Sequence, residues 1–312
     1  MTKRELNKLK KIILPLLALS FFIASKCNEY IEPIHKEIDK GNLNANTEYC
    51  NVSTRLEMPR LKGENSMFLV KQVPEYGVNF CVEYNCLKRA SRWIAFRWDI
   101  NNTTNKNVGR NEKWSEDNDI PEEYRVKLSD HINDNYDRGH MMASEDRQNS
   151  KEANAQTFLM TNIHPQFNKF NGSSAGRSYV WVNLEKRVRK FYENWTKEQN
   201  GQDTIYVVKG GTIDKDEQIL EITKKGLVVP KYFFMAFLYK NNQPTQYGYK
   251  AMAFWIEHTD GVDTTSGDDL KKYMISIDQL EEYTGIDFFC NLPDKIEDIV
   301  EANTEPKDWG FN

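Results

Sequence analysis

The segment Tyr136–His140 reads YDRGH, and three downstream segments carry further polar and charged side chains. These are TNIHPQ at Thr161–Gln166, the single residue Asn171, and WVNLE at Trp181–Glu185. Cleavage with one hard divalent cation requires a base for water, an oxygen-rich metal site and cations that bind the phosphate. The four segments supply all three kinds of group, so they predict a site of this class.

Within the first segment, His140 is the predicted general base, because an imidazole titrates near neutrality and can take a proton from water. Gly139 allows a sharp turn and the close approach of a phosphate. Arg138 can bind a phosphate oxygen, and Asp137 can hold a metal-bound water or fix the loop. Taken alone, the segment fits a second reading equally well: a turn closed by an Asp137–Arg138 salt bridge.

The later segments favour the catalytic reading. Asn171 follows Asn162 by nine positions, after a proline that ends a predicted helix. At these positions the chain resembles the DNA/RNA non-specific endonuclease family, the ββα-metal nucleases that include secreted bacterial nucleases and mitochondrial endonuclease G. The resemblance runs from about residue 58 and also includes the segments Trp93–Phe96, Val207–Thr212, Val229–Pro230 and Ser276–Gly285.

The resemblance implies a role for each main residue. His140 resembles the general base, and Asn171 resembles the one direct protein ligand of a Mg²⁺ ion that keeps its waters. Mn²⁺ is a compatible substitute. Glu185 resembles the carboxylate that holds metal-bound water, one turn after Trp181, which is expected to face the core. Arg138 resembles a cation that stabilises charge on the phosphate in the transition state.

Two further residues follow from the same resemblance. Arg110, in the loosely patterned segment Arg110–Trp114, resembles a second phosphate-binding cation, and Asn162 is expected to support the site through hydrogen bonds. The implied reaction is one-step hydrolysis of DNA and RNA substrates that leaves 5′-phosphates. Contacts mainly to phosphate imply weak sequence discrimination, because base edges carry the sequence information.

One departure from the family pattern lies between Asn171 and Trp181. Residues 172–180 read GSSAGRSYV, several residues more than the compact family spacing. The relative placement of Asn171 and Glu185 therefore does not follow from helix spacing, and Asn168 becomes an alternative metal ligand. The additional residues also fit a loop that contacts substrate.

The fold predicted from periodicity is one α+β domain, with a central antiparallel or mixed β-sheet flanked by helices. The resemblance adds a ββα-metal motif at the active site. We expect the endonuclease domain at residues 58–305 and a tail at 306–312. Strands are predicted at 68–70, 79–84, 92–98, 204–208, 226–230, 232–239 and 249–256, and helices at 144–162, 178–199 and 277–284.

The N-terminus resembles a secretory signal. Five Lys or Arg residues between positions 3 and 11 precede the apolar run Ile12–Ala24, which is short for a bilayer span. We expect a signal peptide at 1–26 and a polar tether at 27–57, with an uncleaved membrane anchor as the alternative. Cys27 stands where a lipid anchor would be attached, although Lys26 is unusual there. The predicted location is exported: periplasmic, outer-membrane lipoprotein or extracellular.

The remaining cysteines, Cys50, Cys81, Cys86 and Cys290, show no CxxC spacing, which argues against a thiolate zinc site. In an oxidising compartment they are compatible with one or two disulfides, such as Cys81–Cys86 and Cys50–Cys290. The sequence does not fix the pairing.

The net charge is −4. Residues 1–26 hold six Lys/Arg and one Glu, so the rest has 36 basic and 45 acidic residues, a net charge of −9. This argues against tight nucleic-acid binding but is compatible with a turnover enzyme. The basic clusters Lys186–Lys190 and Lys88–Arg92 are either phosphate contacts or solvated faces.

Two other functions remain open at this level. The same residues would suit a metal-dependent phosphodiesterase for small molecules, or the fold could be retained for binding alone. Because a binding module has no use for a general base, the combination of His140, Arg138, Asn171 and Glu185 favours an enzyme. The sequence leaves open whether the protein forms a homodimer.

Overall fold

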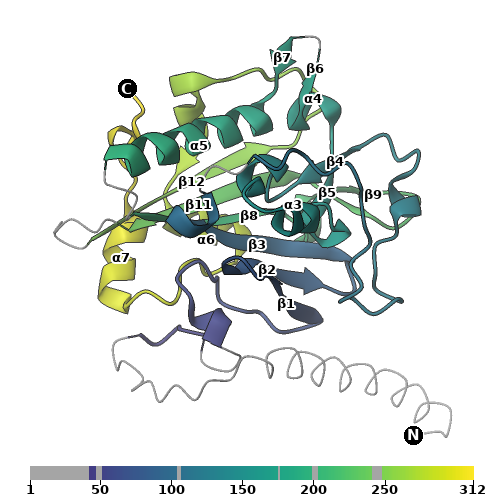
Figure 1. The fold of residues 1–312 in the computed structure, drawn as a ribbon, viewed down its shortest axis with the longest axis horizontal. Coiled ribbons are helices and arrows are strands. Elements are labelled where there is room, and N and C mark those ends of the chain that lie inside the picture. Colours follow the sequence, from purple (N-terminus) through teal and green to yellow (C-terminus); the bar gives the residue numbers. More distant parts are fainter. Residues whose placement is uncertain (1–41, 47–50, 104–106, 175, 199–202, 241–247) are drawn as a thin grey trace, which may run out of the picture.

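The computed structural model describes residues 42–46, 51–103, 107–174, 176–198, 203–240 and 248–312. Its centre is a seven-stranded sheet in the order β1-β2-β3-β8-β11-β12-β13, in which every neighbouring pair is antiparallel (Figure 1). The strands are β1 Ser66–Val73, β2 Gly77–Asn85, β3 Ala90–Trp98, β8 Thr204–Gly211, β11 Tyr232–Lys240, β12 Tyr249–Glu257 and β13 Met274–Ile275. The predicted α+β class is confirmed, with an antiparallel sheet.

Both faces of this sheet are apolar, which explains why its strands read as continuous rather than alternating hydrophobic runs. Side chains of successive residues point to opposite faces. In β3, for example, Ile94 and Phe96 belong to one core, whereas Trp93 and Ala95 belong to the other. Each face therefore requires its own cover of helices and loops.

Helix α5 (Val180–Glu198) covers the first face and crosses above the sheet in Figure 1. Val180, Leu184, Val188 and Phe191 are buried at helical spacing and pack into the core that contains Ile94 and Phe96. The helix predicted at 178–199 is thus confirmed within the described residues.

Helices α6 (Ile277–Thr284) and α7 (Asp294–Ala302) both contact β12 and supply residues of the second core. Helix α6 begins at the cap residue Ser276, whose hydroxyl accepts a hydrogen bond from the Gln279 N–H, and ends at Gly285 with φ 71°. Its bounds match the predicted 277–284. Helix α7 was not predicted.

The connection from β3 to β8 holds most of the remaining elements. They are α2 Ile100–Thr103, β4 Asp137–His140, α3 Lys151–Gln156, β5 Ile163–Gln166, α4 Asn168–Asn171, β6 Ser173–Ser174, β7 Arg177–Ser178 and then α5, with 3-10 turns at Leu128–His131, Ser144–Arg147 and Met160–Asn162. A small hairpin of β9 (Ile219–Ile222) and β10 (Val228–Pro230) follows β8. Further 3-10 turns lie at Asn51–Thr54, Asp216–Gln218, Gly267–Tyr273 and Pro306–Trp309.

The prediction of one helix over 144–162 is wrong, because polar side chains there bind backbone carbonyls. The Asn154 amide donates to the Ser144 carbonyl at 2.7 Å, and the Thr157 hydroxyl donates to the Asn154 carbonyl at 2.7 Å. Such side-chain bonds compete with helical hydrogen bonds. Only Lys151–Gln156 remains α-helical.

Both ends of the described chain pack onto the domain instead of extending away from it. Asn46, in the segment predicted as a tether, is buried, and its amide donates to the carbonyls of Ser53 and Pro59. In the predicted tail, Trp309 is 1% exposed and its ring centroid lies 5.2 Å from that of Phe191. The domain therefore includes these segments. The proposed signal peptide and Cys27 lie outside the described residues.

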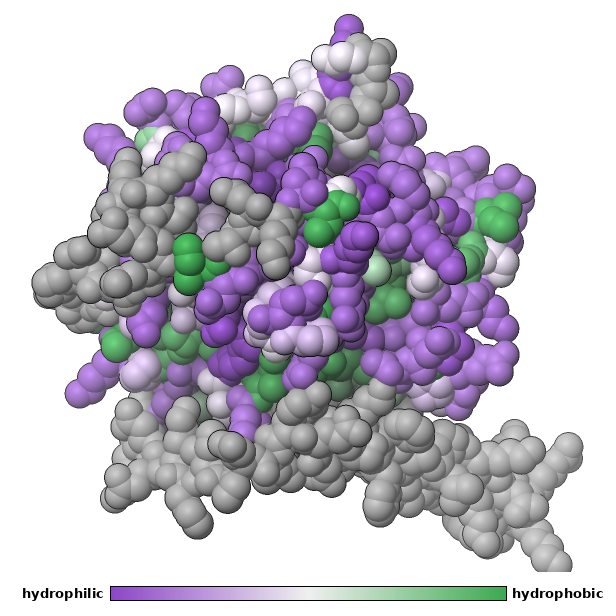
Figure 2. Space-filling view, viewed as in Figure 1, coloured by the Kyte–Doolittle hydropathy of each residue, from purple (hydrophilic) through white to green (hydrophobic). Residues whose placement is uncertain are grey.

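The expected Cys81–Cys86 disulfide is absent from the described residues. Cys81 packs in the second core and Cys86 in the first, so the two side chains face opposite sides of the sheet. Cys81, Cys86 and Cys290 are all buried, and no disulfide joins any two of them; Cys50 lies outside the described residues. The face in Figure 2 is largely hydrophilic, with scattered apolar spots.

Candidate active site

A β-hairpin followed by a short helix carries the central residues. Strand β4 pairs with β5, with Asp137 opposite Gln166 and His140 opposite Ile163, and α4 begins two residues after β5. A Cβ on Gly139 would lie 2.1 Å from Oε1 of Gln166, so glycine is required for this close approach. The order strand, strand, helix matches the predicted ββα motif.

His140 packs against two aromatic rings, whose own centroids lie 4.9 Å apart. Its ring centroid is 5.1 Å from that of Trp114 and 4.9 Å from that of Phe158. Arg138 stacks over Trp114 at 5.3 Å, and Arg110 over Phe158 at 4.9 Å, each measured from the guanidinium carbon to the ring centroid. The aromatic pair therefore gathers both predicted phosphate-binding cations around the imidazole. Trp114 and Phe158 were not predicted as site residues.

The electrostatic surroundings of His140 favour its neutral form. Burial, assisted by the positive charges of Arg110 and Lys209, lowers the pKa of His140 to about 3. Its Nε2 atom is buried without a hydrogen-bond partner in the described structure. The ring is thus an uncharged proton acceptor at neutral pH.

Asp137 links the hairpin to α4. Its Oδ2 atom accepts hydrogen bonds from the side-chain amides of Asn168 at 3.1 Å and Asn171 at 3.2 Å. Asn171 is partly buried, whereas Asn168 is exposed. One carboxylate and two amides therefore meet at the start of β4, and the structure does not distinguish Asn168 from Asn171 as a ligand.

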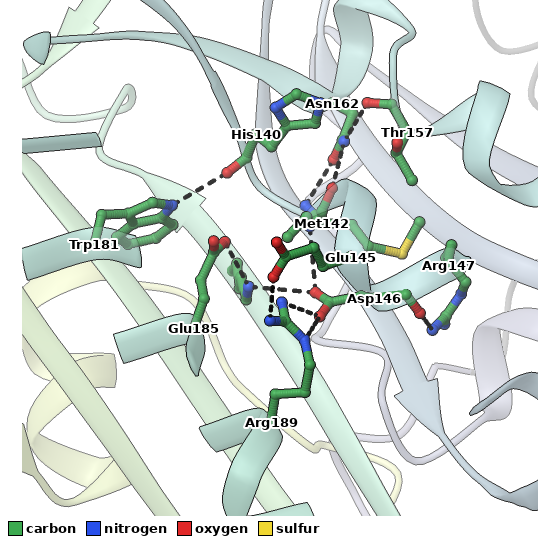
Figure 3. A network of polar contacts seen from close by, with 12 residues as sticks. His140, Met142, Glu145, Asp146, Arg147, Thr157, Asn162, Trp181, Glu185 and Arg189 are labelled. Carbon is green, nitrogen blue, oxygen red and sulfur yellow. Dashed lines mark hydrogen bonds and ion pairs between the residues drawn. The ribbon is translucent and has the colours of Figure 1, made fainter. Parts of the chain in front are cut away.

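Glu185 lies in a buried ion-pair network (Figure 3). Its Oε1 atom is 3.1 Å from Nζ of Lys209, which is itself 3.7 Å from Asp146, and Arg189 pairs with the same Asp146 at 2.8 Å. Burial raises the pKa of Glu185 despite Lys209, whereas Arg189 and Lys209 outweigh burial at Asp146 and lower its pKa. Lys209, on β8, was not predicted.

Trp181 connects this network to the hairpin. Its indole N–H donates to the carbonyl oxygen of His140 at 3.2 Å (Figure 3), and its ring stacks on Phe170 of α4 with centroids 5.9 Å apart. The indole therefore fixes the start of α5, four residues before Glu185, against both β4 and α4.

Asn162 stabilises the backbone that follows His140. Its side chain accepts from the Met142 N–H at 2.9 Å and donates to the carbonyls of Met142 at 2.9 Å and Thr157 at 2.7 Å (Figure 3). All its hydrogen-bonding atoms serve this backbone, as expected for a buried supporting amide.

A family model for the DNA/RNA non-specific endonucleases matches residues 68–295, well over half of the chain. The chain belongs to the DNA/RNA non-specific endonuclease family. A nuclease of Nostoc sp. is 29% identical over 72% of this chain and 76% of its own length. The mitochondrial nuclease of Saccharomyces cerevisiae is 26% identical over 67% and 63%.

The fold is also found among solved structures of this endonuclease family. The structure of EndoG in the EndoG/EndoGI complex has a TM-score of 0.57 and 19% sequence identity, and it covers 72% of this chain and 87% of that one. The family match and the named nuclease relatives show a nuclease that hydrolyses nucleic acid.

The predicted location, which was exported as a periplasmic, outer-membrane lipoprotein or extracellular protein, is wrong. The matched relatives of Saccharomyces cerevisiae and Schizosaccharomyces pombe are mitochondrial nucleases, which points away from export. A basic and apolar N-terminus does not by itself separate the two destinations, since mitochondrial transit peptides are also basic. In the part of the chain that the structure describes, no helix has the length and apolarity to cross a membrane.

This family depends on a divalent metal ion, and the residues of this endonuclease fit such an ion. Asp137, Asn168 and Asn171 offer carboxylate and amide oxygens, which hard cations prefer, and no cysteine lies among them. The amide groups that bind Asp137 through nitrogen leave their oxygens available as ligands.

The two basic clusters noted in the sequence are largely neutralised within the endonuclease fold. Arg189 pairs with Glu145 and Asp146, Arg187 with Asp268, and Arg92 with Asp214. Arg110 and Arg138 instead stack on the rings that contact the histidine.

The buried network gives a stability prediction. Replacing Lys209 with methionine should lower the free energy of unfolding by about 3–5 kcal/mol, because Glu185 would stay buried without its cation. Urea denaturation measures this loss. The double variant Lys209→Met/Glu185→Leu should recover most of it. A loss below about 1 kcal/mol in the single variant would show that the pair is not a buried ion pair.

Proposed function

We propose that this chain is an endonuclease that hydrolyses phosphodiester bonds of both DNA and RNA, with His140 as the general base and Mg²⁺ as the metal, and leaves 5′-phosphate ends. The observation that carries the proposal is the neutral imidazole of His140 packed against two arginine-stacked rings, on the strand that also carries Asp137.

In the proposed reaction His140 accepts a proton from the attacking water, and the water oxygen forms a bond to phosphorus as the bond to the 3′ oxygen breaks. Arg138 and Arg110 bind the non-bridging phosphate oxygens and orient the phosphorus for in-line attack. Asn171 and Asp137 would hold the metal, and Glu185 would fix its water. A bound Mg²⁺ would supply positive charge for the phosphate and the departing oxygen.

The tolerance of both sugars follows from the same groups. Arginines and a metal recognise phosphate, which DNA and RNA share, and no residue of the proposed mechanism reads a base edge. Because the whole chain carries a net charge of −4, electrostatic attraction to the substrate is local to the site. The affinity for nucleic acid should therefore be weak and should increase as the salt concentration falls.

Digestion of supercoiled plasmid and of long RNA, with Mg²⁺ and with EDTA, tests the proposal. We expect internal cleavage of both polymers in Mg²⁺, none in EDTA, and fragment ends that ligate or label as 5′-phosphates. Cleavage of small phosphodiesters with both polymers left intact would replace the proposal by the small-molecule alternative. Binding of either polymer without any cleavage would support the alternative that the fold is retained for binding alone.

A pH prediction follows from the surroundings of His140. Because its pKa is lowered to about 3, kcat/KM should not fall as pH decreases through 6.5, where an ordinary histidine becomes protonated. The activity should persist to about pH 5. A profile of kcat/KM at saturating Mg²⁺ measures this, and a decline centred at pH 6.5 or above would contradict it.

The same lowered pKa makes the folded state less stable in acid. A histidine that is harder to protonate when folded contributes stability that is complete above pH 6.5 and decreases as pH falls toward 3. Circular dichroism at each pH of the activity profile therefore separates unfolding from titration of the catalytic base.

A further inference from the structure

An acidic cluster lies on the face of the sheet opposite α5. The carboxylate oxygens of Asp278 and Glu281 on α6 and of Glu301 on α7 lie within 4.8 Å of one another. The two helices contact each other and β12 and belong to the second core, whereas α5 belongs to the first. The cluster is thus separated from the candidate active site by the sheet (Figure 1).

Glu301 is the buried member of the cluster. It is 4% exposed, and its Oε1 atom is buried without a hydrogen-bond partner in the described residues. A buried carboxylate is costly unless it is paired, hydrogen-bonded or bound to a metal. The carboxylate of Glu301 has an oxygen within 4.8 Å of those of Asp278 and Glu281, so the buried group that lacks a partner is part of the cluster.

The charge around the three carboxylates is negative. Among the described residues no lysine or arginine forms a salt bridge with Asp278, Glu281 or Glu301, while the charges of Glu297 and Asp287 act on Glu301 as well. Burial and these neighbours raise the pKa of Glu301 to about 11 and that of Glu281 to about 8. Either protonation of these carboxylates or a bound cation must offset the negative charge.

The geometry favours a cation. The three carboxylate oxygens lie within 4.8 Å of one another, close enough to bind one Ca²⁺ ion, whose bonds to oxygen are about 2.3–2.6 Å long. Exposed Asp278 and partly buried Glu281 leave one side for water ligands. Ca²⁺ accepts several carboxylates in irregular geometry, whereas Mg²⁺ prefers to keep its water and an octahedral arrangement.

We propose that Asp278, Glu281 and Glu301 form a calcium site that joins α6 to α7. Its role is structural: an ion bound only in the folded state stabilises that state in proportion to its concentration and affinity. The ion would secure two helices that cover β12, far from the residues that contact the phosphate.

Equilibrium dialysis and thermal unfolding, both with Mg²⁺ in excess, test the site in the full chain. We expect the wild-type protein to bind one Ca²⁺ more than Glu301→Gln, and saturating Ca²⁺ to raise its Tm by roughly 5–10 °C. Asp278→Asn, a change at an exposed position, should weaken Ca²⁺ binding at least about tenfold, because it removes one charged ligand. Glu282→Gln, on the same helix, should behave as wild type.

Two results would overturn the calcium site. One is equal Ca²⁺ binding by wild type, Glu301→Gln and Asp278→Asn. The other is a wild-type Tm that does not respond to Ca²⁺ while Glu301→Gln is at least as stable, since a protonated Glu301 would then explain the cluster. Nuclease activity of Asp278→Asn in Mg²⁺ should be unchanged, which keeps this test independent of the proposed reaction.

Discussion

Replacing His140 with alanine should lower the single-turnover rate of plasmid cleavage by about a thousandfold or more and leave the fold intact. General bases contribute about 10²–10⁴-fold, and among the described residues no other histidine shares the pair of rings and arginines around this one. Its imidazole makes no side-chain hydrogen bond that the fold would lose in the described structure. Circular dichroism and Tm should therefore stay close to wild type.

A second histidine of the hairpin provides the matched control. His164 on β5 is buried and is hydrogen-bonded to the carbonyl of Ser91 and to its hydroxyl. His164→Gln should lose stability through these contacts but retain the cleavage rate of its folded fraction. A His140→Ala protein that keeps a tenth or more of wild-type activity would remove His140 from the role of base.

Replacing Asn171 with alanine should reduce cleavage by about 10²–10³-fold and raise the Mg²⁺ concentration needed for half-maximal rate, because the proposed protein ligand is lost. Asn168→Ala is a close control. Both amides donate to the same Oδ2 atom of Asp137, from the same helix and at nearly equal distance. Both variants lose one hydrogen bond to Asp137, so a large difference in their Mg²⁺ dependence reports the metal-ligand role.

The comparison of these two variants decides between the ligands. We expect Asn168→Ala to remain within about threefold of wild type at saturating Mg²⁺, since the loss of one exposed hydrogen bond is worth little. A larger loss of cleavage rate for Asn168→Ala than for Asn171→Ala would identify Asn168 as the metal ligand. Titrations of rate against Mg²⁺ for both variants give the answer directly.

The sheet and two helices could be predicted because local signals and burial agree there. Apolar runs such as Tyr232–Tyr239 form β11, and Ser276 and Gly285 cap α6. Helix α7 and the burial of Trp309 were missed, since both depend on packing against segments distant in the sequence. The break in the helix after Ser144 depends on individual amide hydrogen bonds, which periodicity does not report.

The site shows a similar division. Asn168 and Asn171 of α4 lie 31 and 34 positions from their partner Asp137, so their place in the site was predicted from the family motifs and not from local spacing. Lys209 lies 24 positions from its partner Glu185 and reaches it only because β8 runs beneath α5. Trp114 and Phe158 likewise meet His140 through the fold, and no local spacing marks them.

The central claim is that His140 and Asn171 act on one phosphate as a single site, and a double-mutant cycle tests it most directly. Single-turnover rates of plasmid cleavage should be measured for wild type, His140→Ala, Asn171→Ala and the double variant. Residues that act as a unit lose activity non-additively, so the double variant should be no more than a few-fold slower than the slower single variant. A double variant whose loss equals the product of the two single losses would contradict the account.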